Sequence, residues 1–503
     1  MTMEVRGALA SGDVSDQNEA GVLATAYPLL SAMWLPVCAV IFYGFIYEIF
    51  GRFAYPYPLE WLEPATSDIV SRILSGLPVY CEPTYSYVPS MKASLYYYVV
   101  AAVALLLGDS LHAGRLVSIL ASFGVGFVIW TFIRREGGTR TWSLFGVALF
   151  LGAYHLSLDW YDIARLDSLF LLLTMAGAFA LRFARRPAIA GLAFSAAFFT
   201  KQAVLFVIIP MLLLYAFAEP KRVKIAASTA AVLIATGIAG MHLATDGWST
   251  YFLFEVPRHA AFRLDEIARL FAGDILAPLF LALLSTIGLI AKNWKSEPAR
   301  ALFYGGLLCG TLLVGLVGRA NVAGSPNVFM PAYAVLAVAM PLGLQIILTA
   351  WSEGKGLKFA VGVAVHLAAV AQLAILSYDP RHAIPSPHDK EVSEQMLTRL
   401  RGIDKRMLIM DDRYFARLLG NQSIGLDYSL TDVILDRSSP VTAKLQQSII
   451  DALRTRQFAG VVDPPAFIRE KLELGPPVIL QSTPLDQRNR FTPRLEAYYP
   501  VAN

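Results

Sequence analysis

The chain has 503 residues, of which 56% are hydrophobic and only 16% charged, with a net charge of +4 and a mean hydropathy of +0.53. This composition is typical of an integral membrane protein. Three scattered cysteines are too few for a disulfide framework or a zinc cluster, and no basic patch interleaved with aromatic residues points to nucleic-acid binding.

Long uncharged runs recur from residue 26 to residue 377, each close to the roughly 20 residues that cross a hydrocarbon core. Residues 1–26 are a polar leader without a clear signal-peptide cleavage site, so we expect a cytoplasmic leader and a retained first span. The sequence predicts an all-α polytopic bundle of about eleven transmembrane helices within 27–377. The predicted spans are 27–50, 114–133, 141–158, 167–181, 187–200, 202–218, 223–243, 269–291, 299–318, 327–350 and 357–377.

The first outer loop, residues 52–112, is long for a chain whose other connections are short, and long loops in compact proteins are often functional. Glu60 and Glu63 are i, i+3 neighbours near the membrane surface. Lys92 precedes an apolar run at 93–107 that is too short to cross, which predicts a juxtamembrane helix. Lys92 either extends to the membrane interface or is a fixed cation beside the two carboxylates.

The sequence DWYDIARLDSLFLLL, which begins at Asp159, places four charges before an apolar run. If its first seven residues are helical, Asp159, Asp162 and Arg165 share one face. Asp167 would begin the next span, where the helix dipole favours an acid. A charge at membrane depth costs on the order of 3 kcal/mol, so Arg165 and Asp167 are expected to face a polar cavity or a partner.

Lys201, in AFFTKQAVLF, is the sole charge between Arg186 and Glu219. The positive-inside rule disfavours a lysine at an outer turn, so either an anion such as a lipid phosphate or a neighbouring carboxylate should compensate its charge. A second polar outer turn, GRANVAGSPN, supplies Arg319 and Asn327 ahead of a late span.

Positive charge is concentrated in alternate loops. Fourteen Lys and Arg residues occur in the loops at 134–140, 182–187, 219–224, 292–300 and 353–358. The positive-inside rule assigns these loops to the cytoplasm. The other loops then face the periplasm of a bacterial inner membrane, together with everything after residue 377.

Residues 378–503 change sharply in composition and predict a small periplasmic α/β domain. Its predicted strands lie in KRMLIMDD, FAGVVDP and PPVILQS, and its predicted helices are 412–419, 443–457 and 466–473. The segment has neither a Gly-rich phosphate loop nor paired His ligands, so we expect it to cap the bundle or to dock an acceptor.

Carboxylates and cations gathered on one membrane face suit a substrate that is half lipid and half polar. A carboxylate can take a proton from an attacking hydroxyl, and cations stabilise a departing phosphate. A sugar carried on a polyprenyl phosphate needs both. Because its phosphate is already a competent leaving group, no strong general acid is required.

Several stretches resemble motifs of the GT-C superfamily of integral-membrane glycosyltransferases, especially bacterial relatives of protein O-mannosyltransferases and lipid A aminoarabinose transferases. The resemblance covers roughly residues 55 to 345. The stretches are EWLEPATSDIVSRILSGLPVY, PSMKASLYYYVVAAVALLLGDSLHAGRLVSILAS, ARLDSLFLLL, AAFFTKQAVL and GSPNVFMPAYAVLAV. The chain departs from the family pattern where Leu62 separates the acidic pair and where KASLYY lacks a proline.

The resemblance implies a GT-C-like bundle with an extracytoplasmic cavity and a donor sugar on undecaprenyl or a related polyprenyl phosphate. The acceptor would be a lipid, a glycan or a protein, and the transfer would be inverting. A first-loop carboxylate, Glu63 or Glu60, would be the catalytic base. Asp167, with Asp162, would be the second acidic position.

The resemblance also implies which residues bind the donor, and it leaves the metal open. The donor phosphate and sugar would be met by Lys92, Arg165, Lys201, Arg319 and Asn327. Some relatives bind a divalent cation; the acids here could hold one, although no His lies at ligand spacing.

Two other functions compete with this hypothesis. A transporter or flippase of lipid-linked sugars would also need buried charge, but the chain has no evident inverted repeat with matched broken helices. A membrane-anchored binding protein whose tail does the work would leave Arg165 and Lys201 unexplained. A transferase requires Glu60, Glu63, Arg165, Asp167 and Lys201 to converge in a single cavity open to the outer face, whereas a transporter would distribute them across the bilayer.

Overall fold

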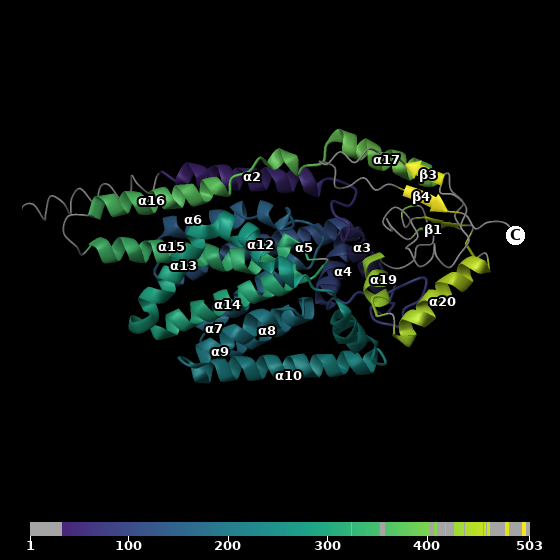
Figure 1. The fold of residues 1–503 in the computed structure, drawn as a ribbon, viewed down its shortest axis with the longest axis horizontal. Coiled ribbons are helices and arrows are strands. Elements are labelled where there is room, and N and C mark those ends of the chain that lie inside the picture. Colours follow the sequence, from purple (N-terminus) through teal and green to yellow (C-terminus); the bar gives the residue numbers. More distant parts are fainter. Residues whose placement is uncertain are drawn as a thin grey trace, which may run out of the picture.

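The structure is a computed structural model that describes residues 33–322, 324–352, 358–401, 407–409, 418, 427–436, 438–455, 457–458, 460–462, 478–481 and 495–498. These residues form an elongated helical bundle, with the C-terminal helices and strands at one end of it (Figure 1). The predicted leader, 1–26, lies outside the described residues.

A helix overlaps each of the eleven predicted spans. These helices are α2 (Leu35–Phe53), α5 (Ser110–Arg135), α6 (Arg140–Gly152), α7 (Asp167–Phe183), α8 (Ala188–Thr200), α9 (Val204–Ala216), α10 (Pro220–Ala244), α13 (Ala277–Ser296), α14 (Pro298–Ala320), α15 (Met330–Ser352) and α16 (Lys358–Ile375). Within the described part, seven helical segments are long and apolar enough to cross a membrane. The chain is therefore a multi-pass membrane protein. Helices α6, α8 and α9 have 13 residues each, fewer than a crossing takes, so the count of eleven stays a prediction.

Helices α9 and α14 pack backbone to backbone because glycines of α14 face the contact. A Cβ on Gly310 would lie 2.2 Å from the carbonyl oxygen of Val207, and one on Gly306 would lie 2.8 Å from the Cα of Met211. Small residues permit such close packing where lipid removes the hydrophobic driving force between helices. This contact fixes two walls of the pocket described below.

The first outer loop contains two helices, α3 (Glu63–Leu74) and α4 (Leu95–Leu107). Helix α4 ends at Gly108, whose φ of +73° is left-handed. Asp109 then caps α5 by accepting hydrogen bonds from the amides of Leu111 and His112. The sequence LGDS therefore makes the turn that brings α4 back beside α5.

The predicted span 141–158 ends early. Helix α6 stops at Gly152, the single turn η1 (His155–Ser157) follows, and Leu158 and Asp159 adopt φ values of 62° and 59°. A right-handed helix cannot continue through left-handed residues. The segment before α7 is irregular, so the helical face considered for Asp159, Asp162 and Arg165 does not form.

Three loops predicted to share the cytoplasmic side meet at one carboxylate. Glu136 accepts a 3.0 Å hydrogen bond from Arg182 Nε and lies 3.0 Å from Arg300 Nε. These residues belong to the loops at 134–140, 182–187 and 292–300. The contact supports the alternation of the loops, while the side that faces the cytoplasm stays a prediction.

The connection between α10 and α13 contains only short elements. They are α11 (Trp248–Thr250), η2 (Tyr251–Glu255), η3 (Val256–His259), η4 (Leu264–Glu266), α12 (Ile267–Phe271) and η5 (Ala272–Leu276). This connection is joined to the turn after α14, because Arg263 N donates to Ala320 O at 2.7 Å and Val322 N donates to Ala261 O at 3.0 Å. The turn η6 (Pro326–Phe329) then leads into α15.

The C-terminal region contains η7 (Pro380–His382), α17 (Pro387–Arg401), α19 (Asp427–Ile434) and α20 (Pro440–Arg454). Strands β1 (Met407–Ile409), β2 (Gly460–Val462), β3 (Val478–Gln481) and β4 (Leu495–Tyr498) form a sheet in the order β1-β2-β4-β3. Strand β1 is parallel to β2, and β4 is antiparallel to both β2 and β3. Strand β4 was not predicted from the sequence. The predicted helix 466–473 and all of 412–419 except residue 418 lie outside the described residues, and the boundaries 378–503 stay a prediction.

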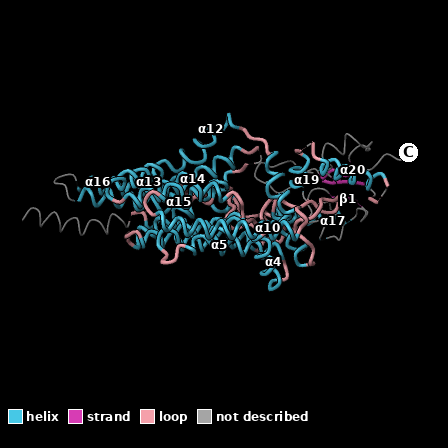
Figure 2. Tube along the Cα trace, turned by 90° about the horizontal axis from the view of Figure 1, so that it is seen from below, coloured by secondary structure: helices cyan, strands magenta, loops and turns pink. Residues whose placement is uncertain are grey.

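The C-terminal region and the first outer loop share one hydrophobic core. Tyr80 and Tyr96 of the loop belong to the same buried cluster as Leu430 and Val433 of α19. Helices α4, α19 and α20 accordingly lie toward the same end of the molecule in the second view (Figure 2). Two segments that are distant in the sequence thus pack together at one end of the bundle.

Candidate active site

Arg165 lies between two carboxylates that are distant in the sequence. Its Nη1 donates to Glu60 Oε1 at 2.9 Å, and its Nε donates to Asp167 Oδ2 at 3.2 Å. The guanidinium also covers the Trp160 ring, with 3.9 Å between Cζ and the ring centroid. All three charged side chains are largely buried.

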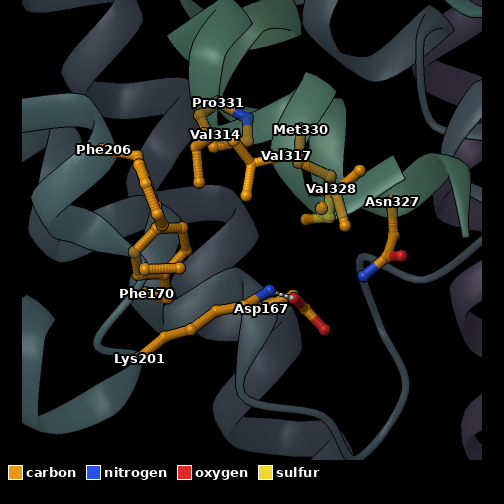
Figure 3. Close-up of a pocket in the computed structure, with 12 residues that line it drawn as sticks. Asp167, Phe170, Lys201, Phe206, Val314, Val317, Asn327, Val328, Met330 and Pro331 are labelled. Atoms are coloured by element: carbon orange, nitrogen blue, oxygen red, sulfur yellow. Dashed lines mark hydrogen bonds and ion pairs between the residues drawn. The ribbon is translucent and has the colours of Figure 1, made fainter. Parts of the chain in front are cut away.

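Lys201 completes this chain of charges. The last turn of α8 ends at Thr200, and the extended backbone of Lys201 directs its side chain toward the start of α7. Lys201 Nζ donates to Asp167 Oδ1 at 2.7 Å (Figure 3). Of the two compensating partners considered for Lys201, the neighbouring carboxylate is therefore present. Glu60, Arg165, Asp167 and Lys201 form one continuous ion-paired row.

A largely apolar pocket opens beside the Asp167–Lys201 pair. It encloses about 80 Å³ and is lined by residues of α7, α9, α14 and the start of α15, including Phe170, Phe206 and Val314. Asn327 lines the same pocket, and Figure 3 shows its amide on the side where the ion pair lies. The pocket therefore has a polar end and an apolar end.

Glu63 is fully occupied by protein groups. Arg115 donates to both of its oxygens, at 3.0 and 2.8 Å, and the amides of Ala164 and Leu59 donate at 2.7 and 2.6 Å. Burial alone would raise the pKa of Glu63, but Arg115 and these amides outweigh it and hold the pKa below its usual value. Glu63 is thus a stable anion with no free lone pair directed at a substrate.

Glu60 differs from Glu63 in both partners and pKa. It accepts one hydrogen bond from Arg165 and one from the amide of Leu62, at 2.8 Å. Burial raises the pKa of Glu60 above its usual value, although Arg165 and the amide oppose the shift. A carboxylate with a raised pKa and fewer donors is the better proton acceptor of the two.

Asp162 belongs to a different cluster from the other predicted site residues. It accepts a 2.9 Å hydrogen bond from Arg52 Nε and a 2.6 Å hydrogen bond from the Tyr154 hydroxyl. Arg52 also donates to the carbonyl oxygen of Asp159, at 2.8 Å. The left-handed turn before Trp160 directs Asp162 toward α2, so it does not reach the Arg165 row.

Lys92 lies beside the row without joining it. No carboxylate in the described residues lies within ion-pair distance of its ammonium, but Lys201, Asp432, Asp167 and Arg165 all act on it electrostatically. Burial, followed by the charge of Lys201, lowers the pKa of Lys92 to about 8. The carboxylates that act on Lys92 are Asp432 and Asp167, and not the pair Glu60 and Glu63 that was considered from the sequence.

Arg319 is held away from the row. Its Nε donates to Asp274 Oδ2 at 2.7 Å, and its Nη1 donates to the Gly324 carbonyl oxygen at 2.6 Å. Asp274 belongs to η5, directly before α13, and Gly324 belongs to the turn after α14. Arg319 therefore connects these two segments, while Asn327, which follows the same turn, lines the pocket.

Sequence reasoning missed three side chains that organise this face: Arg52, Arg115 and Asp432. Arg52 and Arg115 are isolated charges at the ends of apolar runs, and that position could have marked them as paired. Asp432 of α19 has a buried Oδ2 with no hydrogen-bond partner among the described residues. Nothing in the sequence marks its proximity to Lys92.

The residues at this site do not fit a divalent cation. Glu60 and Asp167 are each bound to arginine or lysine, which compete with a metal for the same oxygens. Among the residues that the structure describes, no three His, Cys, Asp or Glu side chains lie close enough to hold an ion.

The chain is similar to known proteins in part of its sequence and in its fold. Residues 91–243 match the family of dolichyl-phosphate-mannose-protein mannosyltransferases. None of the curated protein sequences matches the chain.

Two solved structures have a similar fold. The crystal structure of ArnT from Cupriavidus metallidurans bound to undecaprenyl phosphate superposes with a TM-score of 0.58, at 13% identity, over 94% of this chain and 99% of ArnT. The structure of ArnT from the same organism in the apo state superposes with a TM-score of 0.57, at 13% identity, over 95% of this chain and 98% of ArnT. The resemblance to the GT-C membrane glycosyltransferases that the motifs predict is confirmed.

Proposed function

Because the chain has the fold of the GT-C membrane glycosyltransferases, we propose that it transfers a sugar from a polyprenyl-phosphate donor to a lipid, glycan or protein acceptor. The observation that carries this proposal is the ion-paired row of Glu60, Arg165, Asp167 and Lys201. Asp167 and Lys201, at one end of this row, line the apolar pocket, whereas Glu60 and Arg165 do not. The row supplies both a proton acceptor and cations, and the pocket offers an apolar surface for a prenyl chain.

The donor phosphate would be held by Lys92, Arg165 and Lys201. Arg165 and Lys201 have carboxylate partners, which keep their donor groups in place before the substrate arrives. Lys92 has no such partner in the described part of the chain and has charge available for an anion. A protein of the same fold binds undecaprenyl phosphate, which supports this class of donor.

The reaction would be a single inverting displacement. Glu60 takes the proton of an acceptor hydroxyl while the hydroxyl oxygen attacks the anomeric carbon on the face opposite the phosphate. The bond between that carbon and the phosphate oxygen breaks, and its electron pair leaves with the polyprenyl phosphate. The proton remains on Glu60, and the cations stabilise the charge that develops on the phosphate.

We place this reaction on the periplasmic side of a bacterial inner membrane. The first outer loop, 52–112, carries Glu60 and Lys92, and the C-terminal region packs on the same end of the bundle. The positive loops that meet at Glu136 would then face the cytoplasm. Membrane lipids would surround residues 27–377, and residues 378–503 would be exported.

A direct assay tests the proposal. Purified protein is incubated with labelled polyprenyl-phosphate sugars and a membrane extract, and the acceptor fraction is analysed for label. We expect the sugar to leave its phosphate carrier and to appear on an acceptor. Recovery of intact lipid-linked sugar that has only changed leaflet in vesicles would favour a flippase instead.

The pKa of Lys92 predicts an alkaline limit to donor binding. The ammonium is charged below its pKa of about 8 and neutral above it, so we expect the KM for the donor to rise by up to about tenfold as the pH increases from about 7 to 9. The donor phosphodiester keeps its charge over this range. In Lys92→Arg the side chain stays charged, and the alkaline rise in KM should disappear. An unchanged rise in that variant would contradict the assignment.

A further inference from the structure

Gln202 follows Lys201 directly and connects three segments of the outer face. Its Nε2 donates to the Met91 carbonyl oxygen at 2.8 Å and to the Leu253 carbonyl oxygen at 3.4 Å. Met91 is the residue before Lys92, and Leu253 belongs to η2. One side chain amide therefore connects the turn that carries Lys201 to the backbone that carries Lys92.

The orientation of this amide follows from its partners. Both partners are carbonyl oxygens, which only an N–H can satisfy, so the NH₂ group must face them. The Oε1 atom then points elsewhere and is buried without a partner among the described residues. Leaving a buried oxygen without a hydrogen bond costs free energy, because buried polar atoms are normally paired. The two hydrogen bonds from Nε2 to the carbonyl oxygens must therefore offset this cost and hold Gln202 in place.

A connection at this point is needed because Lys92 and Lys201 repel each other. The two cations act electrostatically on each other, and of the two only Lys201 is ion-paired with the carboxylate of Asp167. On the other side of Lys92, the Tyr80 hydroxyl donates to the Lys92 carbonyl oxygen at 2.6 Å. Tyr80 and Gln202 thus hold the backbone around Lys92 from two directions.

We propose that Gln202 is a positioning residue that keeps Lys92 and Lys201 at a fixed separation, so that both cations bind the same donor phosphate. The inference rests on the proposed function, and Gln202 acts through Lys92 without touching the reacting atoms. Cations that are already held in place lose less conformational freedom on binding than mobile side chains do. The hydrogen bonds of Gln202 should therefore increase the affinity for the phosphate.

The test measures binding of undecaprenyl phosphate to the purified full chain. Gln202→Met keeps the length of the side chain and removes both hydrogen bonds, so we expect the Kd to rise by about fivefold to tenfold. The KM for the sugar donor should rise by a similar factor, with kcat changed much less. In the Lys92→Met background, adding Gln202→Met should change the Kd by less than about twofold, because the residue through which Gln202 acts is gone.

Gln372→Met is the matched control. Gln372 is a buried amide that bridges α13 and α16, since its Nε2 donates to Pro278 O at 2.7 Å and its Oε1 accepts from Ala282 N at 3.1 Å. We expect that variant to lower the melting temperature without changing the Kd. Equal effects of Gln202→Met with and without Lys92, or an unchanged Kd in Gln202→Met, would overturn this inference alone. A wild-type chain that does not bind undecaprenyl phosphate would overturn the proposed function and the inference together.

Discussion

Replacing Glu60 by Gln is expected to lower the transfer rate by a factor of about 10² to 10⁴, which is the usual contribution of a general base. The substitution keeps the shape of the side chain and removes its ability to accept a proton. Arg165 retains its ion pair with Asp167, so the cations that hold the donor phosphate stay in place. The measurement is single-turnover transfer of labelled sugar, together with the Kd for undecaprenyl phosphate.

The Kd should change by less than about threefold in Glu60→Gln, because the effect is confined to the chemical step. Glu82→Gln is the matched control, since Glu82 belongs to the same loop but is exposed and paired with Lys444. Transfer by Glu60→Gln at the wild-type rate would remove Glu60 from the mechanism. A large loss of donor binding in that variant would assign Glu60 to the binding of the donor instead.

The sequence alone could not choose between Glu60 and Glu63. Both are acids three residues apart in one polar loop, and nothing local separates them. The difference arises from Arg115, which is 52 residues farther along the chain and saturates one carboxylate only. Contacts between distant segments decide which of the two carboxylates can accept a proton. A single sequence does not reveal these contacts.

The predicted grouping of Arg165, Asp167 and Lys201 rested on a stronger physical argument. A charge near membrane depth needs a partner, and the partners available on that face were few. Helical spacing, by contrast, misplaced Asp162, because two left-handed residues break the helix that would have aligned it with Arg165. Spacing predicts a shared face only where the backbone is regular.

Helices were predictable because about 20 apolar residues in a row leave the backbone few alternatives in a membrane. Short strands in the C-terminal region carry a weaker signal, and β4 was missed. Asp432 comes close to Lys92 because the C-terminal region and the first outer loop pack together, and Gln202 binds the Met91 carbonyl oxygen because the turn after α8 lies against the same loop. These contacts join residues that are far apart in the sequence, so no regular spacing predicts them.

Replacing Arg115 by Met is expected to destabilise the protein by about 3 to 5 kcal/mol, because it leaves the buried carboxylate of Glu63 without its counter-charge. Arg115 also donates to the carbonyl oxygens of Tyr55 and Tyr57, at 2.5 and 2.6 Å. The variant therefore loses both the ion pair and the hydrogen bonds that fix the loop before Glu60. The measurement is the apparent melting temperature of the detergent-solubilised chain.

The double variant Arg115→Met with Glu63→Gln distinguishes loss of charge pairing from general damage. Removing the orphaned charge should restore part of the stability lost in Arg115→Met, so the two effects should not add. Arg381→Met is the control, because Arg381 is exposed and pairs with Asp379 at the surface. Such a surface ion pair contributes little to the free energy of unfolding. Strictly additive losses would mean that Arg115 and Glu63 stabilise the loop independently. In that case the anion at Glu63 would not depend on Arg115, and Glu63 would compete with Glu60 for the role of the base.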